Sequence, residues 1–166
     1  MLDQDAFGNW LSGFADGEGT FVLYLHRNKY KSGTYETHRA FFSLGLRADD
    51  EEILYEIQRF WKVGRILSGK ANKGSRPRQV IRINSARELV EVVIPHFERY
   101  PLRSKKSRDF LIWRKGAELL YAVNRRGFLN SCVEGKWTQD ERQRFRVLIA
   151  ALSEQRKYET RHILHV

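Results

Sequence analysis

Nine residues near the N-terminus, 11–19, constrain the fold of this chain more than any other segment. They read Leu-Ser-Gly-Phe-Ala-Asp-Gly-Glu-Gly, and a strand pattern begins directly after them at Thr20. The apolar residues and the glycines of this segment predict a short helix that ends at a turn. Asp16 and Glu18 then lie at the C-terminal end of that helix, where backbone carbonyls already carry partial negative charge. A carboxylate there costs about 0.3–1 kcal/mol unless a cation or a special hydrogen bond offsets it.

Two explanations of these acids remain open on spacing alone. A hard divalent cation would offset the charge, because Mg²⁺ prefers carboxylate and carbonyl oxygens and often completes its shell with water and phosphate. Alternatively, the segment is an ordinary Asp-Gly turn with solvated acids.

Alternation of apolar and polar residues predicts two β-hairpins. The first joins a strand at 20–27 to one at 39–47, and the second joins 63–68 to 78–84. Acidic residues at 49–52 predict the start of a helix between the hairpins, which Gly64 ends.

Two capping boxes predict helices after the second hairpin. Ser85 with Glu88 starts a helix that is expected to falter at Pro95, and Thr138 with Glu141 starts the last one. A further helix is expected between them. The resulting fold class is α+β, with an αββαββα order to about residue 100 and extra helices over about 103–160. The chain is read as one domain, 1–166, whose first helix covers 6–17.

The charge distribution favours a polyanionic partner. The sequence has 30 Lys and Arg against 20 Asp and Glu, a formal net charge of +10. The first 25 residues carry four acids and no Lys or Arg, whereas 62–82 carry seven basic residues and no acid. Clustered cations displace counterions from a phosphate backbone, so nucleic acid is the expected partner; the alternative is a solvated surface that happens to be basic.

Membrane and secreted classes are not expected. The longest apolar run, 147–152, has six residues, far below the roughly 20 that a membrane-spanning helix needs. The N-terminus is acidic, and the single Cys132 has no partner for an internal disulfide. We expect a reduced, intracellular protein with no membrane partner.

Residues 11–19, followed by a strand, resemble the signature of LAGLIDADG homing endonucleases. The resemblance extends over about the first 115 residues: to the αββαββα order, to 49–54 leading into 63–66, and to the segment Pro-Leu-Arg-Ser-Lys-Lys at 101–106. The expected fold is therefore that family's, with a curved antiparallel sheet that binds DNA.

The resemblance also implies roles for individual residues. Glu18 would be the catalytic acid and metal ligand, with the Gly17 carbonyl as a second ligand for Mg²⁺. Mn²⁺ would substitute for Mg²⁺, and Ca²⁺ would support DNA binding without cleavage. Lys106 or Lys105 would supply a cation near the scissile phosphate, and Arg47, which closes the second strand, takes a place that is often polar and water-positioning in the family.

The same helix would pair with that of a second copy. The expected interface residues are small or structural: Gly8, Ser12, Gly13 and Asp16. Only one copy of the signature is present, so a homodimer on a roughly palindromic site is expected.

Polar strand faces and basic loops would contact the DNA grooves and phosphates. The candidates are Tyr24, His26, Lys29, Lys31, Arg39, Lys70, Lys73, Arg76, Arg78, Arg82 and Asn84.

The predicted function is a site-specific, divalent-metal-dependent endonuclease that makes a staggered double-strand cut. Two alternatives remain: an intron maturase that binds RNA, and a non-catalytic DNA-binding regulator. The expected compartment is a bacterial cytoplasm or an organelle.

Overall fold

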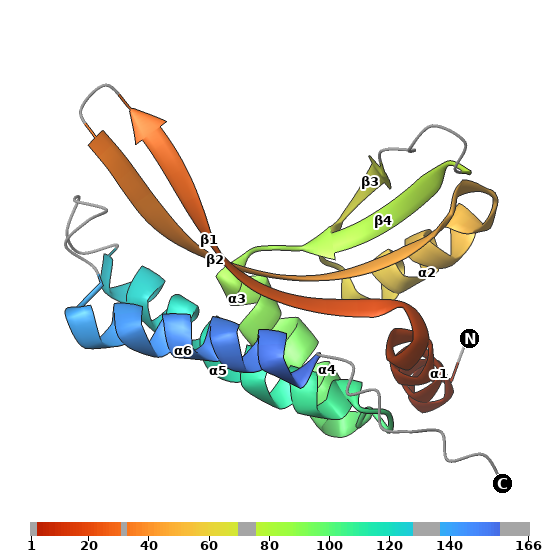
Figure 1. Cartoon of the computed structure of the whole chain (residues 1–166). Helices are drawn as coiled ribbons and strands as arrows, with labels where there is room; N and C mark the ends of the chain where they lie inside the picture. The colour runs from red at the N-terminus through yellow and green to blue at the C-terminus, as the bar shows by residue number, and fades with distance from the viewer. Residues whose placement is uncertain (1–2, 31–32, 70–75, 128–136, 157–166) are drawn as a thin grey trace, which may run out of the picture.

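A four-stranded antiparallel sheet, in the order β1-β2-β4-β3, forms the centre of the molecule (Figure 1). The computed structural model describes residues 3–30, 33–69, 76–127 and 137–156. The strands are β1 (Gly19–Tyr30), β2 (Gly33–Arg47), β3 (Arg65–Gly69) and β4 (Arg78–Ile83).

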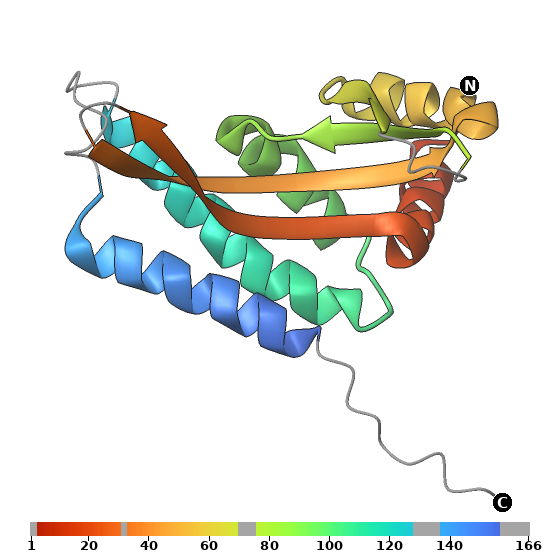
Figure 2. The same ribbon diagram turned by 45° about the horizontal axis from the view of Figure 1, so that its top comes forward.

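Helices lie along one face of the sheet, and the other face is left open (Figures 1 and 2). They are α1 (Gln4–Glu18), a 3₁₀ turn η1 (Ala48–Asp50), α2 (Glu51–Trp61), α3 (Ala86–Glu88), a π-helical segment η2 (Leu89–Val93), α4 (Ile94–Arg99), α5 (Lys106–Gly127) and α6 (Gln139–Gln155). The α+β class and the predicted order of elements are confirmed.

Strand alternation decides which residues form the core. Phe21 on β1, Phe42 on β2 and Ile81 on β4 face the helices and are fully buried with Trp113 of α5. Burial of such side chains is the main stabilising contribution, about 1.5–3 kcal/mol for each. Their neighbours in sequence point to the open face, which is therefore available to a ligand.

Both predicted capping boxes mark helix starts. The Ser85 hydroxyl accepts from the Glu88 amide, and Thr138 and Glu141 cap each other reciprocally. The helix does not break at Pro95, contrary to expectation. The π-helical turn precedes Pro95, which occupies the first turn of α4, where its missing N–H is tolerated.

Two other boundaries differ from prediction. The second strand begins at Gly33, six residues before the expected start, because residues 33–44 pair with the whole length of β1. The helix α2 ends at Trp61, and the next residue, Lys62, adopts a left-handed conformation (φ 58°). Gly64, the predicted end, has a positive φ of its own.

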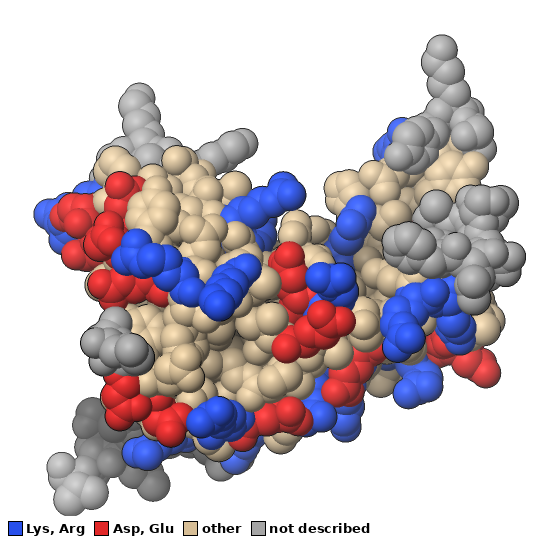
Figure 3. All heavy atoms as spheres, turned by 180° about the vertical axis from the view of Figure 1, so that it is seen from behind, with Lys and Arg blue, Asp and Glu red and all other residues tan. Residues whose placement is uncertain are grey.

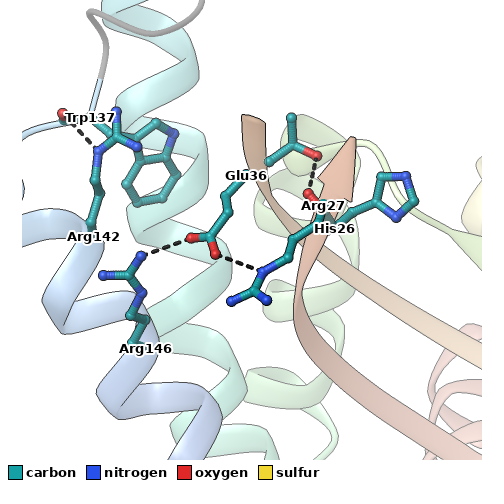
Figure 4. A network of polar contacts seen from close by, with 7 residues as sticks. His26, Arg27, Glu36, Trp137, Arg142 and Arg146 are labelled. Atoms are coloured by element: carbon teal, nitrogen blue, oxygen red, sulfur yellow. Dashed lines mark hydrogen bonds and ion pairs between the residues drawn. The ribbon is translucent and has the colours of Figure 1, made fainter. Parts of the chain in front are cut away.

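A network of charged side chains holds the far end of the β1–β2 hairpin against α6 (Figure 4). Glu36 on β2 accepts from Arg27 on β1 (3.0 Å) and from Arg146 on α6 (2.7 Å). Beside it, the His38 ring stacks on Trp137, with 3.8 Å between the ring centroids. The C-terminal helices therefore support the hairpin from below.

Candidate active site and nucleic-acid interface

The C-terminal end of α1 runs directly into the first strand of the sheet. Glu18 is the last helical residue, and Gly19 begins β1. The Gly19 amide donates to the Ala15 carbonyl, and a Cβ at Gly19 would lie only 2.6 Å from that oxygen. Glycine at 19 thus permits the abrupt change from helix to strand, which leaves the Glu18 side chain about half exposed.

Lys106, the first residue of α5, supplies a cation to this helix end. Its Nζ donates to the carbonyls of Gly17 (2.7 Å) and Ala15 (3.2 Å). Burial lowers the pKa of Lys106, while the nearby acids, led by Glu18, oppose that shift. Of the two lysines predicted for this role, Lys106 is the one at the helix end, and the exposed Lys105 precedes α5.

Asp16 holds Lys106 in place through the segment before α5. Its carboxylate accepts from the Arg103 amide (2.8 Å) and from the amide and hydroxyl of Ser104 (hydroxyl 2.7 Å). Burial raises the pKa of Asp16, but the hydrogen bonds from Ser104 and Arg103 outweigh it, so that the net shift is downward. Asp16 therefore orders this segment within its own chain.

The prediction that Gly8 and Ser12 face a partner helix is wrong. A Cβ at Gly8 would lie 2.4 Å from the Tyr100 ring. The buried Ser12 hydroxyl donates to the Tyr100 carbonyl (2.6 Å) and accepts from His96 Nε2, 3.2 Å away. Burial lowers the pKa of His96 to about 4, so that this imidazole is neutral at pH 7. Asp16 also bonds within the chain, and its place in a dimer interface stays a prediction.

The opposite face of α1 is open, and Gly13 lies on it. No atom lies within 4 Å of an added Cβ at Gly13 or at Gly17. Trp10, 42% exposed, stacks on Phe14 on the same side of the helix. The sequence contains a signal for this arrangement, since residues 10, 13 and 17 recur at helical spacing.

Arg47 and Arg78 are register partners on β2 and β4, and their side chains differ in their contacts. Arg47, predicted to be catalytic, forms a two-point ion pair with Asp49. Arg78, predicted to contact DNA, donates to the Gly45 carbonyl (3.1 Å) and lies 3.9 Å from the Glu18 carboxylate. The structure thus brings Arg78 to the acid and directs Arg47 to Asp49.

Several of the residues predicted to contact DNA lie on the open face of the sheet. Tyr24 and His26 of β1 are exposed on it, and Arg39 is the register partner of Tyr24. The Arg82 guanidinium lies over the Phe41 ring, 4.5 Å from its centroid. Seen from behind, Lys and Arg side chains lie on both sides of the hollow at the top of the molecule (Figure 3).

The remaining candidates fall elsewhere. Lys29 is exposed near the end of β1, on the same side of the strand as Arg27, and its contact with DNA stays a prediction. Arg76 and Asn84 flank β4 and are exposed. Lys31, Lys70 and Lys73 lie outside the described residues. Sequence reasoning missed Arg65, which is the register partner of Arg82 and exposed on β3.

Comparison with known proteins agrees with this geometry. The sequence model of one family, described as LAGLIDADG endonuclease, matches residues 11–117. The chain belongs to this family. A Neurospora crassa relative, "Probable intron-encoded endonuclease 2", is 32% identical over 114 residues, which are 68% of this chain and 24% of the relative. The "Uncharacterized mitochondrial protein RF1" of Saccharomyces cerevisiae is 26% identical over 114 residues, 68% of this chain and 21% of that protein.

Solved structures of this LAGLIDADG family share the fold. I-SmaMI, bound to an uncleaved DNA target in the presence of calcium ions, matches 93% of this chain and 46% of its own, with a TM-score of 0.69 and 26% identity. I-AabMI bound to uncleaved DNA matches 89% of this chain and 44% of its own, with a TM-score of 0.66 and 28% identity. The chain thus spans about a quarter of these curated relatives and just under half of the DNA-bound proteins.

The described residues of this LAGLIDADG protein contain neither a membrane-spanning helix nor a cluster of metal-ligating side chains. No described helix is long and apolar enough to cross a membrane. No group of three or more His, Cys, Asp or Glu in residues 3–30, 33–69, 76–127 and 137–156 could hold a metal ion. A metal ion at Glu18 would therefore need further ligands other than a cluster of such side chains.

Proposed function

We propose that this chain is one half of a site-specific DNA endonuclease that cuts both strands of a long, roughly palindromic site with a stagger. The observation that carries the proposal is the position of Glu18. Its half-exposed carboxylate lies at the end of α1, between Lys106 and Arg78, where the helix joins the open sheet face. An acid held between two cations at the edge of a basic surface suits hydrolysis of a phosphodiester.

The oxygens at this helix end fit a hard divalent ion. The Glu18 carboxylate has Arg78 no closer than 3.9 Å, and the Gly17 carbonyl, which accepts from Lys106, has a second lone pair that could bind a metal ion. We propose that Glu18 and the Gly17 carbonyl hold Mg²⁺, that Mn²⁺ can replace it, and that Ca²⁺ supports binding only. Water, phosphate and the Glu18 of a second copy would complete the ligand set.

The chain's own residues perform the remaining tasks. When bound, a divalent ion supplies Lewis-acid stabilisation and activates water. Water adds to phosphorus and gives up a proton to solvent, the bond from phosphorus to the leaving sugar oxygen breaks, and that oxygen takes up a proton from solvent. Lys106, fixed by two carbonyls, keeps a positive charge beside the developing negative charge on the phosphate.

A second copy would provide the other half-site, as a homodimer. The open face of α1 around Gly13 would pair with its counterpart, because small residues allow two helix backbones to approach closely. The matched share of the DNA-bound relatives supports this proposal, because the chain covers just under half of each. The mitochondrial name of one relative favours an organelle over a bacterial cytoplasm.

The test is selection of cleaved sites from a randomised double-stranded DNA library with Mg²⁺, beside Ca²⁺ and a Glu18→Gln protein. We expect one near-palindromic site, cut with Mg²⁺ by the wild type, bound but uncut with Ca²⁺, and bound but uncut by Glu18→Gln. Glu52→Gln, which removes an exposed carboxylate on α2, is the matched control and should cut normally. Binding of DNA or intron RNA without any cutting would replace the endonuclease with a regulator or a maturase.

A further inference from the structure

Arg78 reaches the end of α1 across the backbone of β2. It is the first residue of β4, and its register partners are Arg47 on β2 and Gly69 on β3. Its Nη2 donates to the Gly45 carbonyl at 3.1 Å and lies 3.9 Å from a Glu18 carboxylate oxygen. Gly45 follows Leu44, the register partner of Gly19. The Arg78 guanidinium therefore lies beside the end of β1 that adjoins Glu18.

Glycines on both neighbouring strands make room for this path. An added Cβ at Gly45 would lie 3.4 Å from Arg78 Nη2 and 3.3 Å from Val80, and one at Gly69 would lie 3.3 Å from the Arg78 Cβ. Contacts of 3.0–3.4 Å force a neighbour to give way. The absence of side chains at Gly45 and Gly69 therefore leaves space for Arg78 to extend toward Glu18.

Arg78 has its charge available, whereas Arg47 does not. Both Nε and Nη2 of Arg47 bond Asp49, which neutralises that guanidinium and satisfies two of its donors. The ion pair of Arg78 with Glu18 is long, at 3.9 Å, and the Arg78 side chain is 58% exposed. A guanidinium has five donors in a planar fork suited to phosphate oxygens, so Arg78 can keep its bond to Gly45 and still bind an anion.

We propose that Arg78, and not its neighbour Arg47, is the second cation of the catalytic centre, and that it binds a non-bridging oxygen of the phosphate that is cut. This inference rests on the endonuclease function proposed above. Lys106 approaches Glu18 from the helix side and Arg78 approaches it from the sheet side. The phosphate would thus be held between two cations.

The test compares Arg78→Ala with Arg47→Ala, a matched pair of register partners. At saturating protein and with Mg²⁺, single-turnover cleavage should fall about 100-fold in Arg78→Ala and less than about tenfold in Arg47→Ala. Arg78→Lys should recover part of the loss, because it keeps the charge without the fork. An Arg47→Ala loss equal to or larger than that of Arg78→Ala would overturn the proposal.

Two further readouts separate a catalytic role from a structural one. Affinity for the site in Ca²⁺ should weaken less than about tenfold in Arg78→Ala, because one phosphate contact among many is lost. The Mg²⁺ concentration for half-maximal cleavage should fall about two- to fivefold, since a like charge near the ion is removed. A rise in that concentration would point to a distorted site and count against the proposal.

The Glu18→Gln protein makes the two proposals separable. If the wild type does not cut, the endonuclease function itself fails. If the wild type cuts, Glu18→Gln does not, and Arg78→Ala cuts within about threefold of the wild type, the role of Arg78 alone is wrong.

Discussion

The ammonium of Lys106 donates hydrogen bonds to the carbonyls of Gly17 and Ala15, at 2.7 and 3.2 Å. These carbonyls belong to the last turn of α1, where two acids make the local charge unfavourable. A cation from a helix 89 positions further along the chain therefore stabilises the end of α1 and at the same time brings positive charge to Glu18. Folding and the proposed chemistry depend on the same side chain.

Lys106→Met should abolish most cleavage. The substitution removes the charge and keeps most of the chain length, and single-turnover cleavage is expected to fall about 100-fold. Because burial lowers the pKa of Lys106 from 10.5, the wild-type rate should begin to fall on the alkaline side below that pH. Lys105→Met is the matched control, with less than about a threefold change. A larger loss in Lys105→Met would assign the cation to Lys105.

Asp16→Ala should destabilise the protein and reduce cleavage together. Three donors from Arg103 and Ser104 lose their acceptor, and the expected loss is about 2 kcal/mol in the free energy of unfolding. The pKa of Asp16 is lowered in the folded state, so its contribution is present above about pH 4 and lost as the pH falls further. Urea unfolding measures the loss.

Ser104→Ala and the double variant provide the check on Asp16. Because Asp16 and Ser104 share one hydrogen bond, the loss of unfolding free energy in the double variant should be smaller than the sum of the losses in the two single variants. Strict additivity would show that Asp16 does not act through Ser104.

Elements defined by local patterns could be predicted from the sequence. The alternation at 20–27 and the boxes at Ser85 and Thr138 depend on residues a few positions apart, and the structure has a strand and two helix starts there. Glu18 at the end of a helix followed by a strand was equally visible, because the glycines around it stop the helix.

Features that depend on tertiary partners could not be predicted in this way. Gly8 and Gly13 are both small residues of one helix, and only the Tyr100 ring distinguishes the buried one from the open one. Arg47 and Arg78 are both strand-end arginines, and the strand register together with Asp49 decides which of them reaches Glu18. Sequence spacing does not contain that register.

His38→Phe should stabilise the protein and make it less sensitive to acid. His38 is 5% exposed, and among the described residues neither of its ring nitrogens has a hydrogen-bond partner. Phenylalanine keeps the ring stacked on Trp137 and removes the unpaired groups, a gain of about 1 kcal/mol at pH 7.

The pH dependence of stability follows from the direction of the His38 shift. Burial lowers the pKa of His38 to about 4, below the 6.5 of an exposed histidine. The unfolded chain therefore takes up a proton first, and stability present above pH 6.5 is lost as the pH falls toward 4. His38→Phe should remove about 2 kcal/mol of that loss and leave the part due to His96. Thermal melts between pH 7 and 4.5 measure it, with the exposed His26→Asn as control; an unchanged acid slope in His38→Phe would exclude His38 as the cause.

Substitutions at Gly13 and Gly8 should have opposite consequences, because the two residues lie on opposite faces of α1. An added Cβ at Gly13 meets no described atom within 4 Å beyond its own helix backbone, so the Gly13→Leu monomer should fold as before. The dimer dissociation constant should rise at least about 100-fold, and cleavage should be lost. Gly8→Ala places a Cβ against Tyr100 and should lower the free energy of unfolding by about 1–3 kcal/mol. Ala150→Leu, at an exposed position of α6, controls for added apolar surface. Sedimentation and urea unfolding separate the two effects. A Gly13→Leu protein that remains dimeric and cuts DNA would show that the open face of α1 is not where two copies meet.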